Sequence, residues 1–294
     1  MFPLDVDIRE VGPRDGLQVE EPLVAADRVR LIEALVAAGV RRLEAAAFVS
    51  PEAVPAMAGA AEVVRAVGRP EGVVVAALVP NVRGAEMALS AGVDELTVTM
   101  AASEEYNRRN VRMSVDESLA EVERIAERAG ATPVDVIVSC AFGSPYEGDI
   151  DPDAVRQLAD TLYDAGAAHL TFADTTGMAT PRRVDDLLDA VGNGVGLHLH
   201  ETRGTALVNA YAALQRGVRH FDTSVGGLGG SPFADGAAGN LATEDLVHLC
   251  DDLVIATGID LEKLLEVSAL VAGLVGHPVP SRVATAGPRS RRAS

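Results

Sequence analysis

The chain has no tryptophan and only two cysteines, and aromatic residues make up 3% of its 294 positions. Cys140 and Cys250 are too few for a disulfide framework and too far apart for a CxxC metal site. Both stand in apolar or helical patterns, so we expect them to be small core residues. The scarcity of aromatic side chains leaves no obvious surface for stacking nucleic-acid bases.

Long apolar runs and an excess of positive charge are also missing. No segment approaches the roughly 18 apolar residues that span a bilayer, and residues 1–5 have neither the basic start nor the apolar core of a signal peptide. The formal net charge of −18 argues against a nucleic-acid partner. We therefore expect a cytoplasmic protein with no membrane partner, in which a local basic patch could still bind an anionic metabolite.

The composition that is present, 48% apolar and 23% charged, is that of a globular protein. Along it, helical patterns repeatedly end in glycine, and a short β-rich run follows a few residues later. These runs are apolar on both faces, as in buried parallel strands. The eight predicted strands lie near Val6–Arg9, Arg42–Ala46, Val73–Val79, Glu95–Met100, Val134–Ala141, His169–Ala173, Gly196–Leu199 and His220–Val225.

Eight alternating strand and helix units over about 250 residues are typical of a (β/α)8 TIM barrel. The alternative is an open doubly wound sheet, which we disfavour because no early Gly-rich dinucleotide loop is present. Leu241–Thr257 has the pattern of the eighth helix, and Asp260–Val275 that of one extra C-terminal helix packed outside. We predict an α/β barrel domain over residues 1–277, followed by a short disordered tail over 278–294 that is rich in Pro, Gly, Ser and Arg.

Two charged residues, Arg14 and Asp15, stand side by side on a tight loop just after the first predicted strand. Gly12-Pro13 ends the strand and Gly16 relaxes the backbone beyond it. Taken alone, the pair is compatible with an ordinary salt bridge on a surface turn. A chemical role depends on the partners that the rest of the chain supplies.

A histidine pair on the seventh predicted strand is the second informative feature. Side chains alternate along a strand, so His198 and His200 share one face, directed into the barrel near its carboxyl end. Barrel enzymes build their sites at that end. Spacing alone is equally compatible with a metal-binding pair and with core histidines. Barrel closure makes strands seven, eight and one consecutive, which brings Asp15 near the pair.

The loop after the eighth strand, residues 226–240, lies between these two features. Its last polar residue, Asn240, can add an amide oxygen to two imidazoles and a carboxylate, a ligand set that suits Mg²⁺ or Mn²⁺. Its glycines do not form a dinucleotide fingerprint, because no acidic residue follows at the spacing that motif needs. They are compatible with a mobile lid or with a flexible surface loop.

Several segments resemble, in order, the motifs of the 3-hydroxy-3-methylglutaryl-CoA (HMG-CoA) lyase family, barrel metallolyases named for an Asp-Arg-Glu signature. The resemblance covers nearly the whole barrel. The matching segments are residues 10–18, Glu44 with 47–51, 79–81, 101–104, 143–148, 174–177, 198–200 and 239–245.

The resemblance implies divalent-metal-dependent cleavage of HMG-CoA to acetyl-CoA and acetoacetate, a retro-Claisen carbon-carbon lyase reaction. It implies Mg²⁺ or Mn²⁺ held by Asp15, His198, His200 and Asn240. Asp15 or His198 would take the proton of the substrate hydroxyl. Arg14 would stabilise the developing oxyanion.

The resemblance also implies further site residues and partners. Glu44 would orient the site from the end of the second strand, whereas Gln18, Ser50, Asp174 and Thr176 would help to bind the acyl-CoA substrate. The homologues imply a homo-oligomer, a dimer or tetramer.

Two positions depart from the family's pattern. Ser231 stands where the family has the cysteine expected to deliver the last proton, and a hydroxyl is a far weaker acid than a thiol, which titrates near about 8.5. Arg203 replaces a tyrosine near the barrel mouth, and it could equally bind a carboxylate or phosphate or lie in solvent. We therefore keep two alternatives: the same chemistry on a different 3-hydroxyacyl-CoA, in the cleavage or the condensation direction, and a catalytically weak acyl-CoA binding protein.

Overall fold

The computed structural model describes residues 2–230 and 238–291, and in it eight parallel strands close into a barrel. β1 (Asp7–Glu10) pairs with both β2 (Arg42–Ala47) and β8 (His220–Thr223), which closes the ring. The other strands are β3 (Val74–Leu78), β4 (Glu95–Ala101), β5 (Val134–Ser139), β6 (His169–Asp174) and β7 (Gly196–Leu199). The predicted TIM barrel is confirmed, with each strand in or beside its expected range.

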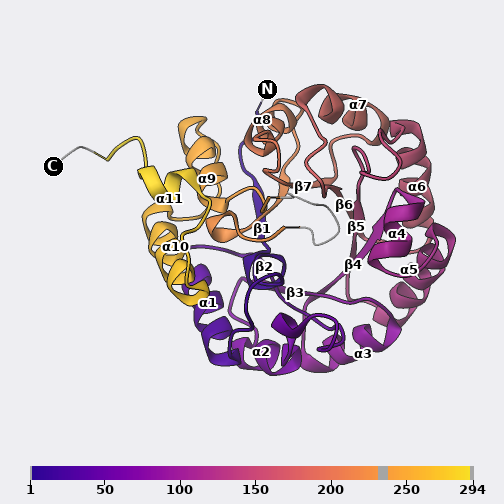
Figure 1. Cartoon of the computed structure of the whole chain (residues 1–294), viewed down its shortest axis with the longest axis horizontal. Coiled ribbons are helices and arrows are strands. Elements are labelled where there is room, and N and C mark those ends of the chain that lie inside the picture. Colours follow the sequence, from indigo (N-terminus) through magenta and orange to yellow (C-terminus); the bar gives the residue numbers. More distant parts are fainter. Residues whose placement is uncertain (1, 231–237, 292–294) are drawn as a thin grey trace.

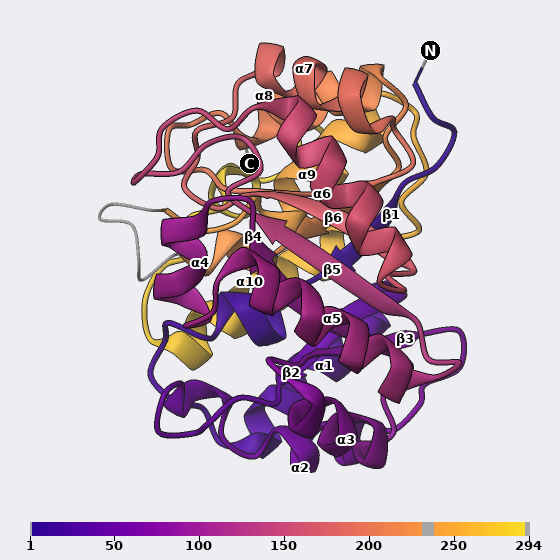
Figure 2. The ribbon, with the colours of Figure 1, turned by 90° about the vertical axis from the view of Figure 1, so that its right-hand side faces the viewer.

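Helices surround the barrel on its outside (Figure 1). They are α1 (Ala25–Ala37), α2 (Ala60–Val67), α3 (Val82–Ala91), α4 (Glu104–Asn110), α5 (Val115–Ala129), α6 (Pro152–Asp164), α7 (Pro181–Val191), α8 (Ala206–Gln215), α9 (Thr243–Asp252), α10 (Leu261–Val275) and α11 (Arg282–Ala286). In the side view of Figure 2, α4 lies near the carboxyl ends of β4 and β5. None of the helices in the described ranges is long and apolar enough to cross a membrane.

Local signals explain where several of these helices begin and end. α5 begins with a capping box, in which the Ser114 hydroxyl accepts from the Glu117 amide and the Glu117 carboxylate accepts from the Ser114 amide. α3 ends at Gly92, whose φ of 100° is open to glycine at little cost. The core lies between the barrel and the helices, and Leu197 and Leu199 of β7 are fully buried in it. Cys140 and Cys250 are buried, as expected.

The C-terminal part differs from the expectation in the length of the eighth helix. α10 is the predicted extra helix and lies between α9 and α1 (Figure 1). α9 ends at Asp252, earlier than predicted, because Val254 takes a φ of 59° that no helix can continue. In the first part of the tail, Asp245 of α9 accepts hydrogen bonds from the Ser281 hydroxyl and the Val283 amide, each at 2.9 Å, and these contacts lie at the start of α11. Disorder of the tail stays a prediction.

Two buried carboxyl groups hold the turn that follows β8. Glu10 accepts from the amides of Gly12 and Val225 at 2.7 and 2.8 Å. Glu244 of α9 accepts from the Gly226 amide at 2.8 Å and from the Ser268 hydroxyl. Burial raises the pKa of Glu10 to about 7 and that of Glu244 to about 8.

These raised pKa values predict that the free energy of unfolding falls as the pH rises from about 5 to about 8. The folded chain holds the Glu244 proton more tightly than the unfolded chain, whose glutamates titrate near about 4.3, so this stabilisation is lost as the pH rises through the folded pKa. One such group contributes at most about 1.4 kcal/mol per pH unit. Glu244→Gln is expected to flatten the slope in urea unfolding, whereas Glu262→Gln, on the exposed side of α10, is not. A wild-type slope in Glu244→Gln would contradict the assignment.

Candidate metal centre and active site

The Arg14-Asp15 pair lies in one turn of π-helix, Gly12–Gly16, directly after β1. The amides of Asp15 and Gly16 both donate to the Val11 carbonyl, at 2.7 and 3.2 Å. A Cβ at Gly16 would lie 2.6 Å from the Ser224 hydroxyl, so any larger residue would have to displace that hydroxyl from its place beside the turn. Arg14 and Asp15 are 5% and 7% exposed, which excludes an ordinary surface ion pair.

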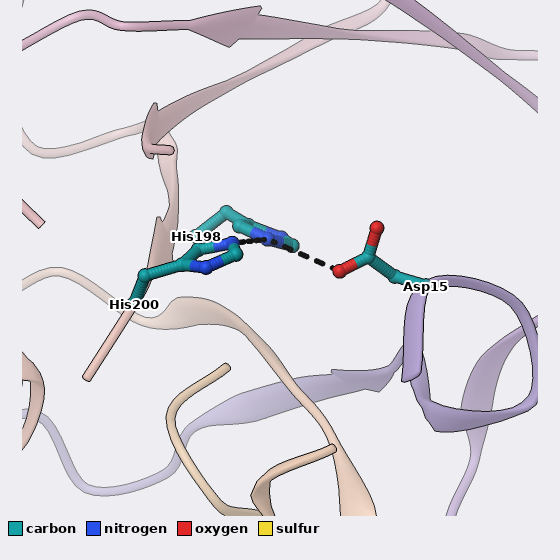
Figure 3. Close-up of side chains that lie close together, drawn as sticks. All are labelled: Asp15, His198 and His200. Carbon is teal, nitrogen blue, oxygen red and sulfur yellow. Dashed lines mark hydrogen bonds and ion pairs between the residues drawn. The ribbon is translucent and has the colours of Figure 1, made fainter. Parts of the chain in front are cut away.

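Asp15 faces the two histidines that β7 places at the barrel mouth (Figure 3). His198 Nε2 lies 3.9 Å from Asp15 Oδ2 and 3.1 Å from His200 Nε2. Potential ligand atoms of the three residues all lie within 4.8 Å of one another. They come from β7 and from the turn after β1, which are brought together because both strands pair with β8.

The Nδ1 atoms of both imidazoles point away from the cluster. Their hydrogen-bond partners influence which ring nitrogen of each histidine carries the hydrogen. His198 Nδ1 lies 3.1 Å from Asp222 Oδ2, and His200 Nδ1 lies 3.1 Å from the Ala238 carbonyl. Both neighbours are acceptors, so a hydrogen on each Nδ1 would satisfy them and would leave an Nε2 lone pair directed toward the cluster. Lone pairs and a carboxylate that converge in this way repel one another unless a cation lies between them. The residues therefore fit a metal ion.

Asn240 adds an oxygen to this cluster. Its side-chain nitrogen donates to Asp15 Oδ2 at 2.7 Å and to the Leu228 carbonyl at 2.9 Å. Its Oδ1 is buried and has no hydrogen-bond partner in the part of the chain that the structure describes. A buried oxygen without a partner costs free energy, and amide oxygens are common ligands of hard divalent cations.

Electrostatics keeps the ligands in the forms that bind cations. Burial raises the pKa of Asp15, but the charge of Arg14 and the two imidazoles outweigh burial and hold the pKa below its ordinary value. Burial, reinforced by His198, lowers the pKa of His200 to about 4. At neutral pH, Asp15 is therefore a carboxylate and His200 a neutral ring, as metal ligation requires.

Arg14 is held beside the cluster by two carboxylates. Its Nε donates to Glu44 Oε2 at 2.5 Å, and its Nη1 donates to Asp15 Oδ1 at 2.6 Å. Glu44, at the middle of β2, is itself fixed by a hydrogen bond of 2.5 Å from the Thr97 hydroxyl. Gln18 lies at the edge of this group, 3.5 Å from Arg14 Nη1. These contacts hold the positively charged guanidinium of Arg14 in a fixed position beside the three candidate ligands.

Comparison with known proteins decides the family. The HMGL-like family model matches residues 5–271. This chain belongs to the HMGL-like family. It is 42% identical to hydroxymethylglutaryl-CoA lyase of Bacillus subtilis over 290 residues, which cover 96% of this chain and 97% of the relative. It is 44% identical to (R)-citramalyl-CoA lyase of Chloroflexus aurantiacus over 302 residues, covering 96% and 95%.

A solved structure agrees with this assignment. An HMG-CoA lyase from Acinetobacter baumannii, in complex with coenzyme A and 3-methylmalate, matches with a TM-score of 0.94 and 39% identity, covering 99% of this chain and 97% of that chain. The predicted family resemblance is thus confirmed, and this member of the HMGL-like family is an enzyme of the lyase class.

The residues predicted to bind substrate in this HMGL-like lyase divide into two groups. Asp174 Oδ1 accepts from two backbone amides, while its Oδ2 and the Thr176 hydroxyl are buried without a partner among the described residues. Burial raises the pKa of Asp174 to about 6. Arg203 Nη1 donates to the carbonyls of Thr176 and Gly177, at 2.7 and 2.9 Å, which ties the loop after β7 to the loop after β6.

Two further predicted site residues, Ser50 for substrate binding and Ser231 for catalysis, are not in this group. Ser50 is exposed on the loop after β2 and donates to Glu52 Oε2 at 2.9 Å. Ser231 lies outside the described residues, as does much of the predicted lid around it. Their roles in the HMGL-like lyase stay predictions.

Sequence reasoning missed Asp222 and Arg9, which lie behind the histidines. Asp222 of β8 contacts His198, and Arg9 of β1 contacts Asp222. Strand alternation offered one signal, since Asp222 follows the apolar Phe221 and therefore points to the opposite face. A charge inside a barrel must be paired, and the identity of its partner could not be read from the sequence.

Proposed function

We propose that this chain is a divalent-metal-dependent lyase that cleaves 3-hydroxy-3-methylglutaryl-CoA to acetyl-CoA and acetoacetate. The observation that carries the proposal is the convergence of Asp15, His198 and His200, three metal-ligating side chains, beside the fixed charge of Arg14. Identity to a hydroxymethylglutaryl-CoA lyase over nearly the whole chain supports the substrate. We propose Mg²⁺ or Mn²⁺ as the ion, because the ligands combine imidazole with carboxylate and amide oxygens.

The ion would be held by Asp15, His198, His200 and Asn240, and when bound it supplies Lewis-acid polarisation of the substrate's oxygens. Asp15 Oδ2 accepts the proton of the substrate hydroxyl; His198 Nε2 could accept it only while it is not bound to the ion. The hydroxyl oxygen then forms a carbonyl, the adjacent carbon-carbon bond breaks, and its electron pair passes to the thioester fragment as an enolate. Protonation of that enolate carbon gives acetyl-CoA.

Arg14 supplies charge where the thioester oxygen becomes negative. Its Nε and Nη1 are occupied by Glu44 and Asp15, which fix the plane of the guanidinium before substrate arrives. Such preorganised charge costs no reorganisation during the reaction. Asp174 and Thr176, with unpartnered buried oxygens, are proposed to bind the acyl group, and Gln18, Ser50 and Arg203 to contribute at the rim. We further propose a dimer or tetramer in the cytoplasm, with acyl-CoA as the small-molecule partner.

A second substrate is favoured by the (R)-citramalyl-CoA lyase relative, whose identity to this chain is as high. The cleavage would then act on a 3-hydroxyacyl-CoA with a different substituent at C3. Measuring kcat/KM for HMG-CoA, citramalyl-CoA and several 3-substituted 3-hydroxyglutaryl thioesters separates the two. The proposal predicts the highest kcat/KM for HMG-CoA, and a clear preference for another thioester would replace that substrate.

Ser231 gives a prediction about the final proton. If the chain is an HMG-CoA lyase that lacks its best acid, Ser231→Cys is expected to raise the turnover of HMG-CoA by about 10²-fold, because positioned acid catalysis is typically worth about 10²–10⁴-fold. Ser90→Cys, on the exposed side of α3, serves as the control and is expected to leave turnover unchanged. No gain in Ser231→Cys would indicate another proton donor or another substrate.

A further inference from the structure

Arg9 contacts both carboxylate oxygens of Asp222. Its Nε donates to Asp222 Oδ1 and its Nη2 to Asp222 Oδ2, both at 2.8 Å. Asp222 Oδ2 is also the atom that lies 3.1 Å from His198 Nδ1. Arg9, Asp222 and His198 are 3%, 4% and 5% exposed. An unbroken buried chain of hydrogen bonds therefore runs from Arg9 through Asp222 to a candidate metal ligand.

The position of Arg9 is itself fixed. Its Nη1 donates to Asp135 Oδ2 at 2.5 Å and approaches Glu95 Oε1 at 3.4 Å, and its Nη2 lies 3.5 Å from the Thr171 hydroxyl. A guanidinium held on three sides cannot rotate. Its two parallel N–H donors therefore fix the orientation of the Asp222 carboxylate. Asp222 is thereby presented to His198 as an acceptor only.

Arg9 can reach the reaction only through Asp222. It lines a cavity of about 30 Å³ together with Asp7, His169 and His220, which are the first residues of β1, β6 and β8. The cavity therefore opens at the end of the barrel opposite to the mouth where Asp15 and His200 lie. A substrate bound at the mouth would not touch the Arg9 side chain.

We propose that Arg9 is a positioning residue: through Asp222 it keeps the hydrogen of His198 on Nδ1 and its Nε2 lone pair directed at the metal centre, which raises the affinity of that centre for a divalent cation. The inference rests on the proposed function of the cluster as a metal centre. A partner that fixes the tautomer and orientation of a ligating histidine is typically worth about 10–100-fold in metal affinity.

The test is Mn²⁺ binding to the metal-depleted full chain without substrate, measured by calorimetry. Arg9→Met and Asp222→Asn are expected to raise the Kd for Mn²⁺ by about 10–100-fold. Arg42→Met is the matched control, because Arg42 is the neighbouring arginine of the same network and its hydrogen bonds go to Glu95 and Asp7. We expect Arg42→Met to bind Mn²⁺ with the wild-type Kd, even if the substitution lowers the thermal stability of the protein.

A second measurement reads the tautomer directly. In the metal-depleted wild type, ¹⁵N spectra of the histidine rings should show the His198 hydrogen on Nδ1. Asp222→Asn should shift it toward Nε2, because the asparagine can offer a donor to Nδ1. If Arg9→Met does not fold, Arg9→Lys takes its place; it keeps the charge without the fork, and a Kd between those of wild type and Asp222→Asn is expected.

Four results separate the possible failures. Wild-type Kd in a folded Arg9 variant overturns the role of Arg9, and so does an equal loss in Arg42→Met. An unchanged His198 tautomer in Asp222→Asn overturns the mechanism. Absence of Mn²⁺ binding in the wild type contradicts the proposed metal centre itself and not only the contribution of Arg9.

Discussion

Replacing His200 by alanine is expected to lower kcat/KM for HMG-CoA by about 10³-fold or more, because a metal ion that polarises substrate is worth several kcal/mol of charge stabilisation. His200 Nε2 lies 3.1 Å from His198 Nε2, at the centre of the candidate site, and its ring is neutral at working pH. The variant removes one of the two nitrogen ligands. Steady-state kinetics over a range of Mn²⁺ concentrations measure the effect, and excess Mn²⁺ should restore part of the rate.

The control for this variant is His169→Ala. His169 is exposed at the opposite end of the barrel, at the start of β6, and its loss should leave kcat/KM unchanged. Circular dichroism shows whether each variant keeps its fold. A folded His200→Ala enzyme with the wild-type rate would contradict the metal assignment.

Replacing Arg14 by methionine is expected to lower kcat by about 10²–10³-fold, the usual cost of removing one preorganised donor to a developing oxyanion. Because Arg14 is not itself a ligand, Mn²⁺ should still bind to the variant, which separates this defect from that of His200→Ala. Arg14→Lys should recover only part of the rate, since one ammonium group cannot reproduce the guanidinium fork between Glu44 and Asp15.

The matched control is Arg108→Met on α4, where Arg108 is exposed and paired with Glu104. It should retain the wild-type kcat. Full recovery of turnover by Arg14→Lys would show that charge alone matters at this position. A wild-type kcat in Arg14→Met would remove Arg14 from the mechanism.

The fold could be predicted from the sequence because the barrel is a repeated unit. Most helical patterns end at or beside a glycine such as Gly92 and are followed by a short apolar run, so the local signals along the chain all indicate one architecture. The contact between the first part of the tail and α9 could not be predicted in this way. The composition of the tail favours disorder, and nothing in it indicates that Ser281 bonds Asp245, 36 positions earlier in the chain.

The part of the candidate site that depends only on which strands are neighbours in a closed barrel could be predicted from the sequence. Closure places the turn after β1 near β7, so the sequence alone assigns Asp15, His198 and Asn240 to one site. The pairing of Arg9 with Asp222 could not, because the two are 213 positions apart and meet only through the register of β1 against β8. Burial of the Arg14 turn was also hidden, since the sequence shows the turn but not its packing.

The most direct test of the account follows acetyl-CoA formation from HMG-CoA by the metal-depleted wild-type protein, with Mg²⁺, with Mn²⁺ and with a chelator. The account predicts acetyl-CoA and acetoacetate in equal amounts when either cation is present, almost none with the chelator, and recovery when Mn²⁺ is added in excess. Cleavage that proceeds undiminished with the chelator, or no acetyl-CoA with either cation, would contradict it.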